Sequence, residues 1–346
     1  MKKIKLFLFA LAAIVSISIH ALAADTIIFG RSSASDSVAL SNAVAVYISP
    51  SGDTSGVTDL TNIQNAINSL PARGGSVYLL NTGEWYISGS TGIQIGNGTN
   101  STSSGRMGIK LEGIGIGGTV NGLGGGIMLH SIVAGPAIQV NGPITSWKIK
   151  NVEINITAAP AGAIALKVVS AEYGEAKNLS IDLYAANQIG IYETSTTATS
   201  SGGNSMFNDW SDINIWMGSL AENAIAWQMT GATHNFNTSH ESARNIEITT
   251  TASTQTGLEL DATDSDIFTN FIIWNSGVAE KAIVFNYGNG VTASWPSDCY
   301  FYGLDPETST ITDTGTPSGA DPNEVYGFAK TNGAVIPTGL ANFNVY

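Results

Sequence analysis

Apolar residues recur at alternate positions in short segments between residues 151 and 285, which is the period of a β-strand. A first series of segments begins at Asn151, Asn178, Asp212, Asn245 and Asn270. A second series begins at Ile164, Ile191, Ile225, Leu258 and Ile283. The residue number rises by the same irregular steps in both series, so the second series keeps a constant offset from the first through all five repeats.

A constant offset inside repeats of varying length predicts two strands joined by a turn of fixed length, with insertions on a third side. This pattern is typical of an all-β fold, the right-handed parallel β-helix, in which coils about 4.8 Å apart hydrogen-bond to one another. Strand alternation places Val152, Ile154, Ile164 and Leu166 inside and Asn151, Glu153 and Asn155 outside. The lead residues of the first series should form a column of Asn and Asp at a tight turn, where these side chains tolerate a left-handed backbone. We interpret this column as structural rather than as a ligand site.

Other repeat architectures fit the pattern less well. Leucine-rich and helical solenoids need a helical stripe in each repeat, and the repeats here contain none. A β-propeller needs four strands in roughly 40 residues with blade signatures, and these are also missing from the sequence.

One helix is predicted before the repeats begin. Leu60, Ile63, Ile67 and Leu70 follow a 3, 4, 3 spacing that places them on one face, and Pro71 ends the segment. We expect a helix over residues 58–70 that caps the first coil of a β-helix spanning residues 58–295. Residues 24–57 would form a lead-in segment, and residues 296–346 would form a tail or a cap on the last coil.

The segment 1–23 differs in composition from the rest of the chain. A basic start, an apolar stretch over residues 6–19 and Ala21-Leu22-Ala23 are typical of a cleaved secretory signal peptide, which predicts a secreted protein. The apolar stretch is too short for a comfortable membrane span, so no membrane association is expected after cleavage. Cys299 is the single cysteine, so an intramolecular disulfide is excluded.

Charge narrows the choice of partners. Three of the 14 basic residues lie in the signal segment, which leaves 11 basic against 27 acidic residues, a net charge of −16. Such a chain repels phosphate backbones, so we expect no nucleic-acid partner. Its many Ser, Thr, Asn and Gly residues suit hydroxyl-rich partners or bound cations.

The start of the predicted coils resembles the pectate-lyase-like superfamily. The resemblance extends from the predicted helix to Gly115, and it is carried by the helix with Ile63, Gln64 and Ala66 and by Gly74-Gly75-Ser76-Val77-Tyr78-Leu79, Gly83-Glu84-Trp85-Tyr86-Ile87 and Leu111-Glu112-Gly113-Ile114-Gly115. It implies a right-handed parallel β-helix and a polysaccharide as partner. The Asn-Thr-Asp, Asp-Asp, Gly-His-Gly and Arg-Ile-Lys motifs of polygalacturonases do not occur, nor does the Arg-x-Pro-x-x-Arg segment of calcium-dependent pectate lyases. The resemblance therefore names the fold and not the reaction.

Stacking of the coils brings carboxylates together. Glu175, Asp209, Glu241 and Asp266 lie three or four positions before successive lead residues and are expected on one patch, bordered by His240 and Arg244. Asp209, Glu241 and Asp266 are the candidate acids for glycoside hydrolysis, which needs two carboxylates about 5 Å or roughly 6.5–9.5 Å apart. The same patch could bind Ca²⁺, and the alternative to both is a solvated acidic surface. No other cofactor or metal is predicted.

Two tryptophans supply a second candidate surface. Trp216 and Trp274 lie four positions after their lead residues and should face outward two coils apart, about 10 Å. Flat indole rings pack against the apolar faces of sugars, so these rings, with Glu175, His240 and Arg244, are candidate substrate contacts. The alternative is that side loops cover both rings.

The sequence thus predicts an exported β-helix protein that degrades or binds a polysaccharide or cell-surface glycan, as a glycosidase or lyase using clustered carboxylates. The alternative is a non-catalytic surface, adhesion or phage-fibre-like β-helix. The sequence makes no prediction of the oligomeric state.

Overall fold

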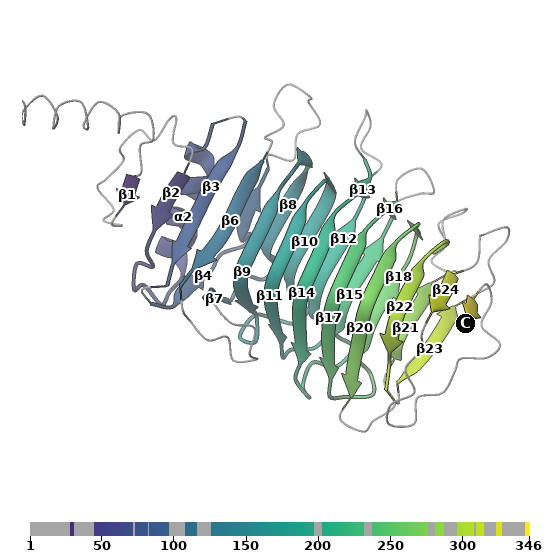
Figure 1. The fold of residues 1–346 in the computed structure, drawn as a ribbon. Helices are drawn as coiled ribbons and strands as arrows, with labels where there is room; N and C mark the ends of the chain where they lie inside the picture. The colour runs from purple at the N-terminus through teal and green to yellow at the C-terminus, as the bar shows by residue number, and fades with distance from the viewer. Residues whose placement is uncertain are drawn as a thin grey trace, which may run out of the picture.

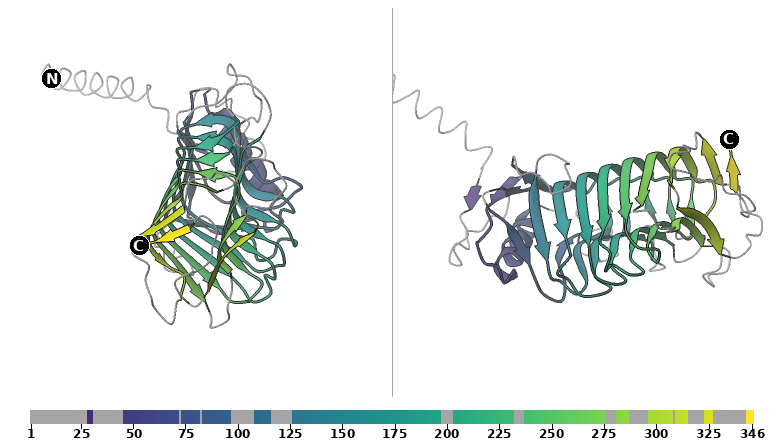
Figure 2. Two further views of the ribbon diagram at one scale, coloured as in Figure 1. Left: turned by 90° about the vertical axis from the view of Figure 1, so that its right-hand side faces the viewer. Right: turned by 90° about the horizontal axis from the view of Figure 1, so that it is seen from below.

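The computed structural model describes residues 28–30, 45–71, 73–81, 83–96, 108–115, 126–196, 203–231, 237–275, 281–286, 296–307, 309–314, 323–326 and 343–346. The chain winds through stacked coils whose strands run parallel to one another in two long sheets (Figure 1). A view along the stack shows the sheets as walls (Figure 2), and the apolar side chains between them are buried. The predicted right-handed parallel β-helix is confirmed.

The first sheet has 14 strands and runs the length of the molecule. In spatial order it contains β1 (Ile28–Gly30), β2 (Ala45–Ile48), β3 (Gly75–Leu80), β6 (Ile109–Ile114), β9 (Lys148–Asn155), β11 (Glu175–Leu183), β14 (Asp209–Met217), β17 (Ser242–Thr250), β20 (Ile267–Asn275), β22 (Tyr300–Asp305), β24 (Asn323–Tyr326) and β25 (Phe343–Val345), while β4 (Trp85–Ile87) pairs with β7 (Ile127–Ser131), which pairs with β9.

The second sheet has 11 strands. It contains β19 (Thr263–Asp264), β16 (Thr238–Ser239), β13 (Ser205–Met206), β10 (Ile164–Glu172), β12 (Ile189–Thr194), β15 (Ile225–Thr230), β18 (Thr256–Leu260), β21 (Lys281–Asn286) and β23 (Thr310–Thr314), with β8 (Pro136–Thr145) joining β10 to β5 (Ile93–Ile95).

The interior file predicted from the first series is present. Ile154, Ile181, Ile215, Ile248 and Ile273 are register partners in successive strands, and all five are fully buried. The prediction for Glu153 is wrong, because strand alternation placed it outside whereas its side chain is fully buried.

The lead residues adopt the left-handed conformation expected of a tight turn. Their φ angles lie between 53° and 57°, and side-chain amides link the column from coil to coil. Asn178 donates to Asn151 at 2.9 Å, and Asn270 donates to Asn245 at 3.0 Å. Asn245 in turn donates to Asp212 at 2.9 Å. Side-chain hydrogen bonds thus link Asn151 with Asn178, and Asp212 with Asn245 and Asn270, and help to fix the bend in the strands that carry these residues. We call the column of lead residues the Asn ladder.

The offset between the two series of strands is not constant in the structure, contrary to the prediction. Leu166, and not Ile164, is the register partner of Ile191. Ile164 follows Asn155 by nine positions, but Ile189 follows Asp182 by seven, although both pairs occupy equivalent places. The turn between the sheets therefore varies in length by two positions. Because side chains alternate with a period of two, a slip of two positions leaves no trace in the pattern. Leu166 is fully buried as predicted, but Ile164, which was predicted inside, is only half-buried.

The helix α2 (Val57–Ser69) covers the first coil, as predicted. Ile63, Ala66 and Ile67 are buried against the coil below. The side-chain amide of Gln64 makes the two hydrogen bonds that the backbone of a neighbouring strand would make. It accepts from the Gln94 N–H at 2.8 Å and donates to the Gln94 carbonyl at 3.1 Å. These two bonds satisfy the free edge of β5, which a β-helix must protect.

The predicted boundaries are only partly right. β22, β23, β24 and β25 continue the two sheets past residue 295, so the coils extend into the segment predicted as a tail. The proposed signal peptide, residues 1–23, lies outside the described residues. Within the described part of the chain, no helix combines the length and hydropathy needed to cross a membrane.

Candidate functional site

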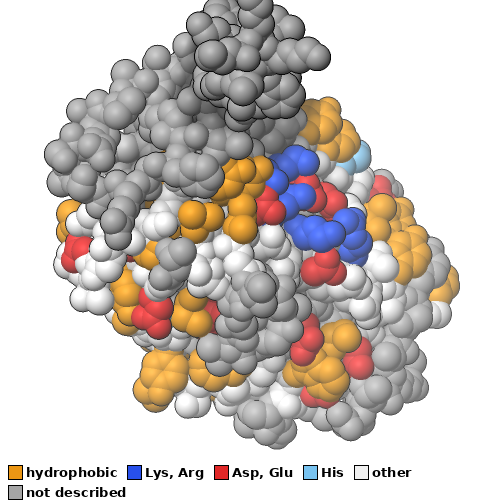
Figure 3. Space-filling model, turned by 60° about the vertical axis from the view of Figure 1, so that its left-hand side comes forward, with side chains coloured by type: hydrophobic (Ala, Val, Ile, Leu, Met, Phe, Trp, Pro, Cys, Tyr) orange, Lys and Arg blue, Asp and Glu red, His pale blue; other side chains and the backbone are white. Residues whose placement is uncertain are grey.

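The outer side of the first sheet, before the Asn ladder, presents two rows of side chains. The first row includes Lys110, Lys148, Glu175 and Asp209, and the second includes Glu112, Lys150, Lys177 and Arg244, in register from coil to coil. We call these eight residues the charged face. It holds five of the 11 basic residues that follow the signal segment. Figure 3 shows the basic side chains gathered in one patch with acidic groups beside them.

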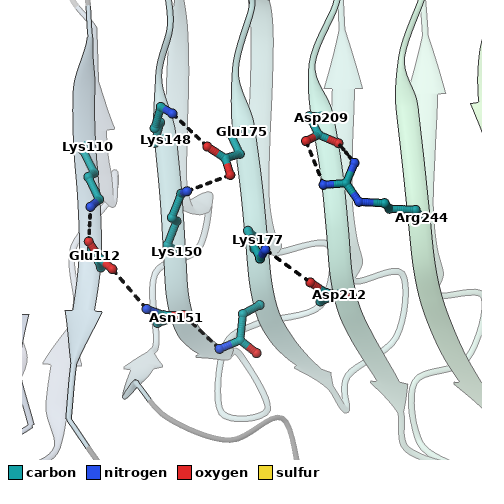
Figure 4. Close-up of polar contacts among 11 residues, drawn as sticks. Lys110, Glu112, Lys148, Lys150, Asn151, Glu175, Lys177, Asp209, Asp212 and Arg244 are labelled. Carbon is teal, nitrogen blue, oxygen red and sulfur yellow. Dashed lines mark hydrogen bonds and ion pairs between the residues drawn. The ribbon is translucent and has the colours of Figure 1, made fainter.

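Two lysines share one carboxylate at the centre of the charged face. Lys148 contacts Glu175 Oε2 at 2.9 Å, and Lys150 contacts Glu175 Oε1 at 2.7 Å (Figure 4). Partial burial alone would raise the pKa of Glu175, but the hydrogen bonds from both lysines lower that pKa from 4.5 to about 2. Glu175 is therefore ionised at any physiological pH, and one positive charge remains in excess.

Arg244 in β17 holds the carboxylate of Asp209, which lies in the neighbouring strand β14. Its guanidinium donates from Nη1 to Asp209 Oδ1 at 2.7 Å and from Nη2 to Asp209 Oδ2 at 3.1 Å, a bidentate pair (Figure 4). Lys177 lies 3.8 Å from the carboxylate of Asp212 at the edge of the Asn ladder. Counting Glu112, Glu175, Asp209 and Asp212 against the five cations leaves this region with a net charge of +1, in a chain that carries −16 without its signal segment.

A hollow of about 470 Å³ adjoins the charged face towards α2. Tyr47, Tyr78, Glu112 and Asn151 line it together with Ile114 and three glycines. The rings of Tyr47 and Tyr78 stack with centroids 4.7 Å apart, and the Lys110 ammonium lies 5.2 Å from the Tyr78 ring centroid. Burial opposes the charge of Lys110, but its ion pair with Glu112 outweighs burial and raises its pKa.

The predicted patch of four carboxylates does not form. Glu175 and Asp209 lie on the charged face, whereas Glu241 and Asp266 are 2% and 0% exposed and point into the interior. The reason is that the residues three and four positions before a lead residue are neighbours on a strand, and neighbours point to opposite sides. Asp209, Glu241 and Asp266 therefore cannot act together on one substrate.

Glu241 and Asp266 belong to an interior polar ladder. Asn208 accepts from the Gly174 N–H at 2.8 Å, Glu241 accepts from the Asn208 N–H at 2.9 Å, and Asp266 accepts from the Glu241 N–H at 2.9 Å. Each side chain thus satisfies a backbone donor one coil away, which buried backbone requires. The ladder continues with Asn323, which accepts from the Cys299 N–H at 3.0 Å. We assign Glu241 and Asp266 a structural role.

Sequence reasoning missed a third buried carboxyl group in this ladder. Glu193 is fully buried, and its Oε1 accepts from Ser205 Oγ at 2.6 Å and from Asn208 Nδ2 at 2.9 Å. Desolvation raises its pKa from 4.5 to about 7. Desolvation, with repulsion from neighbouring carboxylates, raises the pKa of Glu241 and of Asp266 well above the ordinary range.

His240 lies at an exposed corner, two positions before Ser242, the register partner of Asp209. Its ring packs on Phe207 with centroids 5.0 Å apart, and Phe207 stacks on Tyr173 at 5.1 Å. These three residues, which we call the aromatic stack, all have left-handed φ angles between 52° and 59°. His240 was a predicted substrate contact, but no sequence signal identifies Tyr173 and Phe207, because such a backbone is unusual for aromatic residues.

The two tryptophans occupy the predicted positions. Trp216, Thr249 and Trp274 are register partners in successive coils, so the rings are two coils apart on the side beyond the Asn ladder. Trp274 is 40% exposed. Trp216 is half-buried and stacks on Tyr184 with centroids 6.4 Å apart.

The described residues contain no group of three or more His, Cys, Asp and Glu side chains arranged to hold a metal ion. The acidic patch that suggested calcium is itself divided between two sides of the wall. The carboxylates that remain outside, Glu175 and Asp209, are paired with cations.

No protein family matches the sequence, and no curated protein does. Among solved structures, the alginate lyase from Paenibacillus sp. str. FPU-7 aligns with 83% of this chain and 96% of its own, at 13% identity and a TM-score of 0.48. The A-modules of the mannuronan C-5 epimerases AlgE4 and AlgE6 from Azotobacter vinelandii align with 83% of this chain and 93% of theirs, at 13% and 14% identity, with TM-scores of 0.22 and 0.17. At these values no activity is transferred from them to this chain.

Proposed function

We propose that this protein binds an anionic polysaccharide along the charged face. The observation that carries the proposal is the gathering of five cations on four of five successive coils of an otherwise strongly acidic chain. Even scattering of so few basic residues over the surface would give no such patch, and clustered cations raise the local concentration of a polyanion. Export, which residues 1–23 indicate, would bring this face to extracellular polysaccharides.

The geometry favours an extended polymer over a compact anion. The cations come from β6, β9, β11 and β17 and project from a regular wall. Successive coils are about 4.8 Å apart, close to the length of one sugar residue. A polymer with a carboxylate on each sugar therefore meets a cation at nearly every coil, which suits a uronic-acid polysaccharide.

The existing ion pairs are compatible with this proposal. Lys148 and Lys177 have side chains that are 44% and 45% exposed, so both ammonium groups remain open to a ligand. Exposed ion pairs contribute about 0–1 kcal/mol each, so a polymer carboxylate can replace a partner at small cost.

Cleavage of the polymer is a second candidate function, favoured by the hollow beside the charged face. Tyr78 and Glu112 bring a phenol and a carboxylate to its lining, and the Lys110 ammonium lies over the Tyr78 ring and pairs with Glu112. In a β-elimination a base removes the proton next to the sugar carboxylate, the electrons form a C=C bond, the C–O bond at the neighbouring carbon breaks, and the leaving oxygen takes a proton. A cation beside that carboxylate stabilises the charge that develops on it.

Affinity electrophoresis and calorimetry of the full chain with alginate, polygalacturonate, hyaluronate and a neutral β-glucan test the binding proposal. We expect binding of a uronate polymer that weakens as salt rises, and a loss of about tenfold or more in Lys148→Gln/Lys150→Gln. Lys281→Gln is the matched control, because Lys281 is an exposed lysine in β21 on the other sheet. Equal binding of the neutral glucan, or equal affinity in both variants, contradicts the proposal.

Two further variants separate the remaining alternatives. A Trp216→Ala/Trp274→Ala variant that loses binding while the lysine variant keeps it moves the binding surface to the neighbouring side of the wall. Release of unsaturated products that disappears in Tyr78→Phe supports β-elimination. Binding without any product supports the non-catalytic surface protein, and new reducing ends without unsaturation support hydrolysis instead.

A further inference from the structure

The aromatic stack is an exposed feature that the fold does not require. Tyr173 and Phe207 are 55% and 42% exposed, and His240 is also exposed. The same left-handed corner is occupied by Ser146, Ser265 and Asp298 in other coils. Small polar residues therefore suffice at this corner. Bulky residues with positive φ are strained, and such strain concentrates at functional sites.

The rings of Tyr173 and Phe207 stack with a lateral offset, which leaves part of each ring face uncovered. Tyr173 and Phe207 are nearly parallel, with an interplanar angle of 10° and a centroid separation of 5.1 Å. Rings in van der Waals contact lie about 3.5 Å apart along their normal, which implies a lateral offset of roughly 3.7 Å. Partial faces are thus open to solvent on successive coils, in the form that packs against the C–H face of a sugar.

The stack runs beside the charged face. Tyr173 and Phe207 each lie two positions before a member of its first row, Glu175 and Asp209 respectively. The residue between them points inward in both coils, since Gly174 lies against Trp147 and Asn208 is buried. A polymer that follows the charged row therefore has the aromatic stack along one edge.

We propose that Tyr173, Phe207 and His240 form an aromatic rail that binds the apolar faces of successive sugar rings of the polymer held by the charged face. This inference rests on the proposed function, and it adds the basis for selecting a sugar polymer over any other polyanion. Lysines recognise the carboxylates of both kinds of polymer, whereas the rail recognises pyranose rings alone.

The test compares a sugar polyanion with a polyanion that has no rings. The probes are alginate, polygalacturonate and hyaluronate, and poly-L-glutamate of similar length. In Tyr173→Asn/Phe207→Asn the rings are removed, and Asn tolerates the left-handed backbone, so the fold is retained. We expect uronate affinity to fall about tenfold or more, poly-L-glutamate affinity to stay within about twofold, and the urea midpoint not to fall.

Ser265→Asn is the matched control, because it changes the same corner in a coil without a ring. Tyr173→Asn alone makes the same comparison if the double variant does not fold. Unchanged uronate affinity, or a parallel loss for both kinds of polymer, overturns the rail.

The outcomes also separate the rail from the proposed function. Lys148→Gln/Lys150→Gln should lower the affinity for both the uronate polymers and poly-L-glutamate. If Tyr173→Asn/Phe207→Asn loses uronate binding while Lys148→Gln/Lys150→Gln keeps it in full, the charged face is rejected as the binding surface and the rail is retained. A wild-type chain that binds none of the uronate polymers rejects both.

Discussion

The buried carboxyl group of Glu193 should make the stability of the protein fall as pH rises through the acidic range. Its pKa is about 7 in the folded chain, against 4.5 for an ordinary glutamate, because burial disfavours the charged form. Between these two values the folded state binds more protons than the unfolded state. By linkage, the free energy of unfolding then decreases as pH rises from about 4.5 to 7.

The size of the effect follows from the two pKa values. Each unit of difference corresponds to about 1.36 kcal/mol, so this group contributes a loss on the order of 3 kcal/mol across that window. Glu193→Gln removes the titration and keeps the shape and one acceptor for Ser205 and Asn208. The variant should match the wild type near pH 4 and exceed its stability by up to that amount at pH 7 and above.

Urea unfolding followed by tryptophan fluorescence at a series of pH values measures the difference between the two proteins. Groups outside this cluster are the same in both proteins, so the difference reports Glu193 together with its coupling to Glu241 and Asp266. Glu247→Gln, which replaces an exposed carboxylate on the outer side of β17, is the control for the substitution itself. A stability difference that is independent of pH in Glu193→Gln, or one that grows toward low pH, refutes the reasoning.

Two further outcomes concern the ladders. Asn245→Ala removes hydrogen bonds to Asp212 and from Asn270 and leaves alanine at a φ of 54°, so urea unfolding should show a loss of roughly 2 kcal/mol, whereas Asn245→Gly, which tolerates this φ, should lose less. Cys299 is fully buried, and burial raises the pKa of its thiol, so a thiol reagent should label it only in denaturant. Equal losses in the two Asn245 variants, or rapid labelling of the native protein, would contradict these expectations.

The interior files and the Asn ladder were predictable, because a period-two pattern and a repeated Asn or Asp report burial and backbone conformation directly. The slip of two positions between Ile164 and Ile189 was not, since it leaves every side chain on the same side of its strand. The error over Glu241 has the opposite origin. A shift of one position from Asp209 to the place occupied by Glu241 moves a carboxylate from solvent to the interior.

The charged face was also within reach of the sequence. Lys150, Lys177 and Arg244 each lie one position before a lead residue, and Lys148, Glu175 and Asp209 lie three before, so counting back from the ladder by odd numbers recovers six of its eight residues. The aromatic stack was beyond reach. Glycine and asparagine in a sequence indicate a left-handed backbone, but tyrosine and phenylalanine do not. Only the structure shows that Tyr173 and Phe207 occupy the same corner.

Each coil contacts little beyond the coils directly above and below it, so the molecule is modular along its axis. Duplication or loss of one whole coil would change the span available to a ligand by about 4.8 Å and leave the remaining coils as they are. Evolution can therefore change how many units of a chain-like ligand are bound by changing the number of coils, without redesigning a pocket.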